Sequence, residues 1–148
     1  MMRFAIIALL CCSWLGVACT GAKLASDGPG TERPQPRDPY LHFETPHHDF
    51  GTIKLGDTPT YTYVFTNTSG EALELELVSG CECTEIQWPQ NKVFQPEEQG
   101  SIQIRYDSKL EEGIGEHNKT IDVLLKKEDP ETGYQIIKEV KFRVVIEL

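Results

Sequence analysis

Residues 41–148 are predicted to form an all-β fold, an antiparallel β-sandwich of seven to eight strands. Apolar and polar residues alternate with a period of two through this segment, and turn-forming residues separate the alternating stretches. A helical period of apolar residues does not persist for ten residues anywhere in it. Short strands at this spacing are typical of an Ig-like sandwich, and a small barrel is the second choice.

Five strands show the alternation most clearly, and each is expected to bury one face and expose the other. Glu74 and Glu76 are examples of the polar residues that occupy the intervening positions. The residues assigned to the core are, in chain order, Tyr61, Tyr63 and Phe65; Leu73, Leu75 and Leu77; Ile102, Ile104 and Tyr106; Ile121, Val123 and Leu125; and Val140, Phe142, Val144, Ile146 and Leu148.

Turn-forming residues mark the connections between these strands. Residues 67–70, Asn-Thr-Ser-Gly, join two strands closely enough to form a hairpin. Residues 129–133, Asp-Pro-Glu-Thr-Gly, are expected to form another before the last strand. Gly100, Gly113 and Gly115 are interpreted as further breaks.

Residues 1–18 are predicted to be a signal peptide outside the fold. After Arg3 comes an apolar run of about fourteen residues, which is too short for a transmembrane helix. Residues 15–19, Leu-Gly-Val-Ala-Cys, resemble a lipobox with glycine where leucine is usual, so Cys19 is predicted to carry the lipid of a bacterial lipoprotein. The alternative is cleavage after a small residue, which would release a soluble protein. Thr20 replaces the aspartate that often retains lipoproteins in the inner membrane, and this favours the outer membrane.

Residues 19–40 are predicted to be a lipid-anchored flexible linker. Glycine, proline and polar residues dominate this segment, and Leu24 is its only large aliphatic residue. Such a composition buries too little apolar area to offset the entropy of ordering. A spacer from the membrane and a disordered terminus without a spacing role both remain open interpretations.

The net charge of the chain restricts the classes of partner that it is expected to bind. The sequence has 14 Lys and Arg against 23 Asp and Glu, a net charge of −9, and it has no basic cluster. This argues against nucleic acid and against an anionic membrane surface as direct partners. An acidic surface is mainly a solubility feature.

The order of several motifs is similar to that of a known bacterial family. The sequence reads His-Asp-Phe-Gly-Thr-Ile at 48–53, Phe-Thr-Asn-Thr at 65–68 and Cys-Glu-Cys-Thr at 81–84, followed by Phe-Gln-Pro at 94–96. Over residues 42–125 it resembles the family catalogued as domain of unknown function 1573, which is common in Bacteroidetes-type secreted proteins and lipoproteins. That family is similar to Ig-like domains of the Hydin and major sperm protein type. The resemblance implies fold and compartment but no reaction.

Two departures from the family pattern concern glycines. Glu82 stands between the cysteines where the family usually has glycine, and Glu97 follows Pro96 where the family usually has proline-glycine. These changes leave the fold prediction intact. They weaken the idea that the cysteine loop performs one chemistry throughout the family.

Cys81 and Cys83 form the one chemically unusual pair in the predicted domain, and three interpretations remain open. They could form a local disulfide, which needs a turn because Cα atoms two residues apart in a strand are about 6.6 Å apart. They could bind a soft metal with His47 or His48, although two sulfurs are too few for a closed zinc site. They could also be packing residues or a substrate for thiol exchange. Disulfide or packing is favoured over redox or metal roles.

The leading functional hypothesis is a non-catalytic extracytoplasmic lipoprotein whose Ig-like domain binds or scaffolds another component of the cell envelope. No catalytic residue and no cofactor is predicted, and the partner is an unknown envelope protein or glycan. We expect an outer-membrane location on the periplasmic or cell-surface side. The alternative hypothesis is a thiol-redox or copper-handling accessory protein that uses Cys81 and Cys83. Adjacent His47 and His48 would face opposite ways in a strand and are interpreted as ordinary polar residues.

Overall fold

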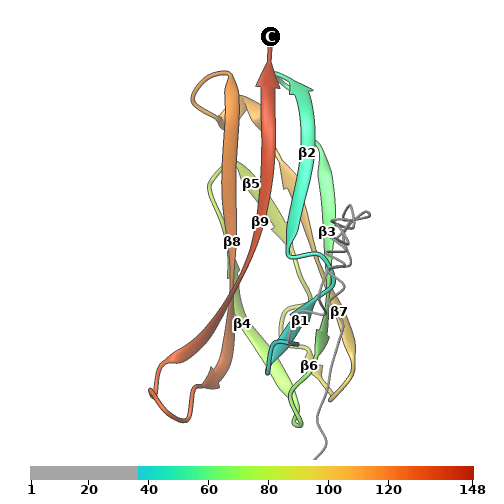
Figure 1. The fold of residues 1–148 in the computed structure, drawn as a ribbon, viewed down its shortest axis with the longest axis vertical. Coiled ribbons are helices and arrows are strands. Elements are labelled where there is room, and N and C mark those ends of the chain that lie inside the picture. The colour runs from blue at the N-terminus through green and yellow to red at the C-terminus, as the bar shows by residue number, and fades with distance from the viewer. Residues whose placement is uncertain (1–36) are drawn as a thin grey trace, which may run out of the picture. The chain divides into compact units, whose positions relative to one another are not determined.

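The computed structural model describes residues 37–148, so Cys19, the signal peptide and most of the linker lie outside the described residues. The described residues contain nine strands in two sheets (Figure 1). The strands are β1 (Leu41–Phe43), β2 (His47–Lys54), β3 (Thr60–Asn67), β4 (Leu73–Ser79), β5 (Thr84–Gln87), β6 (Val93–Phe94), β7 (Gln99–Tyr106), β8 (Gly115–Glu128) and β9 (Gln135–Glu147). The all-β sandwich is thus confirmed, with slightly more strands than expected. In this part of the chain the only helical element is a 3-10 turn at Ser108–Leu110. The described residues thus contain no helix that is long and apolar enough to cross a membrane.

The first strand of the sandwich is divided between the two sheets. The sheet orders are β1-β3-β7-β5 and β2-β9-β8-β4-β6, so β1 and β2 belong to different sheets. All pairings are antiparallel except β2 with β9, which is parallel and corrects the expectation of a wholly antiparallel sandwich. The chain changes sheets between Phe43 and His47, and the carbonyl of Pro46 accepts a hydrogen bond from the Lys141 amide at 2.8 Å.

The predicted core is confirmed at most positions and wrong at two. Fourteen of the expected core residues are buried, and Tyr61 packs against them while partly exposed. Leu77 is 50% exposed because the β4–β8 register shifts between Leu75 and Leu77, which turns Val78 inward instead. Leu148 is 88% exposed because it lies beyond the end of β9.

The predicted hairpin at residues 67–70 is wrong, because this run is a crossover between the sheets. Asn67 ends β3 in one sheet, and β4 begins in the other. The Asn67 side chain is fully buried, and its Nδ2 donates to the carbonyls of Glu71 and Phe94. Its Oδ1 accepts from the Ser69 amide and hydroxyl. The hairpin at residues 129–133 is confirmed and joins β8 to β9.

Gly100 lies inside β7 and is not a break. It pairs with Phe65 on β3, and a Cβ at this position would lie 2.3 Å from the Phe65 ring and 2.5 Å from the Phe94 ring. The glycine therefore makes room for two aromatic rings between the sheets, whose centroids are 5.0 Å apart. Gly113 and Gly115 do mark a break, with φ angles of 95° just before β8 and 113° at its first residue.

Replacing Gly100 by alanine is expected to destabilise the domain by about 1–3 kcal/mol, because the new methyl group overlaps two buried rings that have little room to move. Urea unfolding of the purified protein measures the change. Gly70→Ala is the matched control, since a Cβ at Gly70 meets nothing within 4 Å and this glycine has no left-handed φ. Equal midpoints for the two variants would contradict the packing role of Gly100.

Candidate functional site

The cysteine pair lies in the short loop between β4 and β5. A disulfide joins Cys81 to Cys83, and their Cα atoms are 5.1 Å apart, which is closer than in an extended strand. A turn brings them together, because the Thr84 amide donates to the Cys81 carbonyl at 3.0 Å. Gly80 precedes this turn and packs tightly, since a Cβ there would lie 2.6 Å from the side chain of Ile121. The metal-ligand interpretation requires free thiolates, which this arrangement does not provide.

The two sulfurs differ in their surroundings. Cys83 is 4% exposed and belongs to the core, whereas Cys81 is partly exposed and packs against it. The Thr84 hydroxyl lies 3.1 Å from Cys81 Sγ and 3.8 Å from Cys83 Sγ. The Cys83 carbonyl accepts from the Asp107 amide at 2.8 Å, which ties the loop to the end of β7. Cys81 is therefore the sulfur that a reagent in solution would reach.

A shallow hollow of about 200 Å³ adjoins the disulfide. Its wall is largely polar and includes the exposed ion pair of Glu85 and Arg105, neighbours on β5 and β7, whose charged atoms are 3.5 Å apart. The lining residues are Glu82, Cys83, Thr84, Glu85, Arg105, Asp107 and Leu110. Ligand pockets usually have volumes of about 300–1,000 Å³ and apolar walls, so this hollow is small and polar for a small-molecule site.

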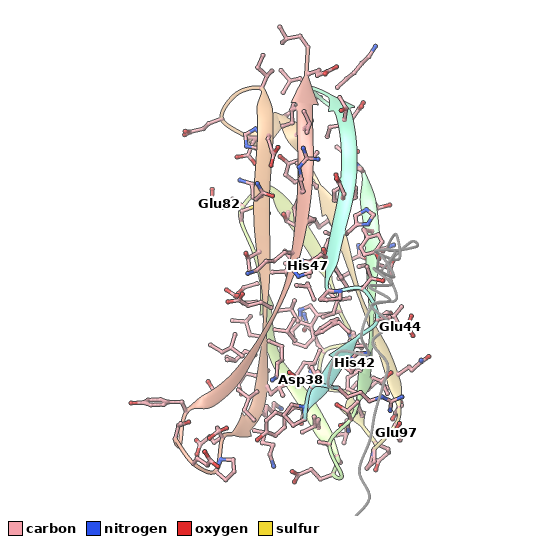
Figure 2. All side chains as sticks on the ribbon, in the orientation of Figure 1. Asp38, His42, Glu44, His47, Glu82 and Glu97 are labelled. Carbon is pink, nitrogen blue, oxygen red and sulfur yellow. A yellow bond between two sulfur atoms is a disulfide. The ribbon has the colours of Figure 1, made fainter. Side chains whose placement is uncertain are left out.

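The histidines of β2 do not join the cysteines. His47 is exposed, and the His48 ring stacks on Tyr61 with centroids 3.6 Å apart and meets the edge of Phe50. Burial lowers the pKa of His48, and the Asp49 carboxylate offsets this only in part. Figure 2 shows that His47, on β2, lies apart from Glu82, which is in the cysteine loop. Within residues 37–148, no three His, Cys, Asp or Glu side chains are grouped to hold a metal.

The structure also contains a polar cluster that the sequence analysis missed. The Glu111 carboxylate accepts from the Tyr106 hydroxyl at 2.9 Å and from Lys119 Nζ at 2.8 Å. His117 Nδ1 lies 3.6 Å from the same carboxylate, and its Nε2 is buried without a hydrogen-bond partner among the described residues. The four residues are spread over two strands and a loop, with no motif to reveal them.

The electrostatics of this cluster favour a structural role. Burial by itself would raise the pKa of Glu111, but the hydrogen bonds from Lys119 and Tyr106 lower it below its usual value. Burial and the Glu111 carboxylate both raise the pKa of Tyr106. A carboxylate that stays charged and a phenol that stays protonated form a stable ion-pair network. The network fixes the loop after β7 to β8.

Several solved structures share this fold. A protein of unknown function from Porphyromonas gingivalis W83 is 16% identical, with a TM-score of 0.58 over 72% of this chain and 46% of that one. The VesB protease of Vibrio cholerae is 10% identical, with a TM-score of 0.53 over 71% of this chain and 31% of that one. The PapD-like domain 7 of human CEP192 is 10% identical, with a TM-score of 0.50 over 83% of this chain and 97% of that one.

At these identities the likeness concerns the fold alone. The chain spans less than half the length of the VesB and P. gingivalis proteins. No curated protein matches the sequence. A family model matches residues 41–140, which is more than half of the chain and extends beyond the motifs recognised in the sequence. The chain therefore belongs to the family described as protein of unknown function (DUF1573).

Proposed function

We propose that this protein is a non-catalytic lipoprotein of the bacterial outer membrane, whose Ig-like domain binds or scaffolds another envelope protein or glycan. The apolar leader of residues 1–18 and Cys19, which follows it, support the lipid anchor. The proline- and glycine-rich composition of residues 19–40 supports a tether between the anchor and the domain.

The observation that carries a binding role is that three of the reactive groups described above are engaged by neighbouring side chains. The two cysteines are joined, the ring of His48 stacks on Tyr61, and the Glu111 carboxylate accepts hydrogen bonds from Tyr106 and Lys119. Catalysis needs polar groups that converge on a substrate, whereas these side chains converge on one another.

One end of the sandwich exposes apolar side chains to which a protein partner could bind. Leu55, Leu110 and Ile114 are 46%, 61% and 55% exposed, and they lie on the β2–β3 and β7–β8 loops. These loops meet, because the Gly56 amide donates to the Ser108 hydroxyl at 2.8 Å. Exposed aliphatic groups gathered at loops are typical of protein contact surfaces. This end is the proposed contact with an envelope protein.

The anchor is tested by replacing Cys19 with serine in the full-length protein. The wild-type protein is expected to fractionate with membranes and to have an intact mass increased by a lipid on Cys19. Cys19→Ser is expected to lose both properties. Cys12→Ser is the control, because Cys12 lies within the proposed leader. Identical fractionation and lipid-free masses for all three proteins would contradict the anchor.

The partner is tested by antibody capture of the protein from detergent-solubilised envelopes. The wild-type protein is expected to retain one component in a stoichiometric amount. Replacing both Leu110 and Ile114 by aspartate is expected to weaken its retention about tenfold or more, because charge is placed in an apolar contact. Val93→Asp is the control, since Val93 is 47% exposed on β6. No enrichment of any protein or glycan with the wild-type protein would contradict the binding role.

The partial exposure of Cys81 supports a second candidate function in thiol exchange. A thiolate of an envelope thiol-disulfide oxidoreductase would attack Cys81 Sγ and form a mixed disulfide, and Cys83 would leave as a thiolate beside the Thr84 hydroxyl. A second thiolate of the oxidoreductase would then release Cys81, so that the oxidoreductase is oxidised and this protein is reduced. A copper-handling role would require that reduced state.

Equilibration in thiol redox buffers distinguishes exchange from a structural disulfide. An exchange role predicts reversible reduction at a potential above about −300 mV, since structural disulfides of secreted proteins lie below that value. Intact mass follows the gain of two hydrogen atoms, and Cys83→Ser is the control that cannot form the pair. A disulfide that stays oxidised down to about −300 mV would exclude this second function.

A further inference from the structure

The edge of the five-stranded sheet is open along the first half of β9. The register of β2 with β9 begins at His47 and Lys141, so Gln135–Val140 have β8 on one side and no strand on the other among the described residues. Figure 1 shows this half of β9 diverging from β2. Pro46 ends the ladder, because proline has no amide to donate to the next carbonyl of β9. The Lys141 amide points toward β2, where it donates to the Pro46 carbonyl. Backbone groups alternate in direction along a strand, so the amides and carbonyls of Ile137 and Glu139 point to the same, open side.

A row of apolar side chains crosses the outer face of the sheet and ends at this edge. Leu77 on β4 lies opposite Leu124 on β8, and Leu124 lies opposite Ile137 on β9. Leu77 and Ile137 are 50% and 57% exposed. Side chains on a wet sheet face are normally polar, and an edge strand with exposed apolar groups is a site for pairing with another strand.

We propose that the open edge of β9 pairs antiparallel with the same edge of a second copy of this chain, centred on Ile137. This pairing would place Ile137 opposite Ile137 of the second copy. The two apolar rows would then join into one row of six side chains across a continuous sheet. Backbone hydrogen bonds would be added at Gln135, Ile137 and Glu139, the residues whose amides and carbonyls point outward.

The sequence around Ile137 is complementary to itself in this register. Gln135 of one copy would lie opposite Glu139 of the other, so an amide donor meets a carboxylate and no like charges face each other. Gly133, which has no side chain, would lie opposite Lys141 of the second copy, where β2 begins. Because β9 starts at Gln135, Gly133 lies in the loop before the strand, and the chain there no longer follows the edge of the second copy. The open length of the edge thus matches the length of strand available to cover it.

Lys138 does not prevent this pairing, although a lysine on an edge strand often does. Its ammonium group binds Asp38 Oδ2 at 2.7 Å, and it lies over the ring of Tyr40, 5.2 Å from the centroid. Asp38 is labelled in Figure 2. The charge of Lys138 is therefore held on the inner side, away from the row that contains Ile137. The acidic net charge still opposes association, so added salt is expected to strengthen the dimer.

Cysteine crosslinking in the envelope of cells that express the full-length chain tests this register. In a pair centred on Ile137, the two copies of residue 137 have Cα atoms about 5.5 Å apart, whereas the two copies of residue 139 are about 13 Å apart along the strands. With a mild oxidant, Ile137→Cys is expected to form a dimer at least about tenfold more efficiently than Glu139→Cys. Both positions are exposed on the same strand, so Glu139→Cys is a matched control.

A mixed experiment tests the same register independently. Cells that express Gln135→Cys and Glu139→Cys chains together are expected to produce crosslinked dimers, while each variant alone is not. Equal dimer yields at residues 137 and 139 would indicate random collision and would overturn the proposal. The absence of dimers at residue 137 would also overturn it, as would an adduct of Ile137→Cys with a protein of different mass. None of these outcomes depends on the partner proposed for the loops at Leu110 and Ile114.

Discussion

The buried side chain of Asn67 holds the two sheets of the sandwich together at their crossover. Its amide and carbonyl oxygen make four hydrogen bonds, to Glu71, Phe94 and Ser69, and its backbone pairs with Glu97 and Glu98. Leaving a buried polar group unpaired costs about 1–3 kcal/mol, so the crossover follows the path on which all four bonds form. That path brings Phe94 of one sheet onto Phe65 of the other.

The division of the first strand is a second constraint, and it decides what surface the domain presents. Because the chain changes sheets at Pro46, β2 covers only the second half of β9 and leaves the first half open. Alternation along β8 and β9 places Leu124 and Ile137, which are register partners, on the outer face. The open edge thus comes from the sheet change at Pro46, and the apolar row that ends there comes from the register of β4, β8 and β9. This links the fold directly to the proposed self-association.

Five of the nine strands and most of the core could be predicted because a period of two is a local signal, whereas β1, β2, β5 and β6 show no clear alternation. The same signal failed at Leu77, since a register irregularity is decided by the pairing of β4 with β8 and leaves no mark in the alternation. It also failed to reveal the Glu111 cluster, whose members come together only when β7, its following loop and β8 pack. The φ of 63° at Glu97, a left-handed conformation that glycine adopts more readily, is likewise not marked by any alternation.

The sequence by itself determined the all-β class, the buried face of most strands and the candidate cysteines, because these follow from residue type and short spacing. Only the tertiary structure decided that residues 67–70 cross between sheets, that β2 runs parallel to β9, and that Cys81 and Cys83 close on each other. Each of these depends on which strands become neighbours. Neighbours are chosen by long-range packing and by hydrogen bonds between distant residues, which no local pattern encodes.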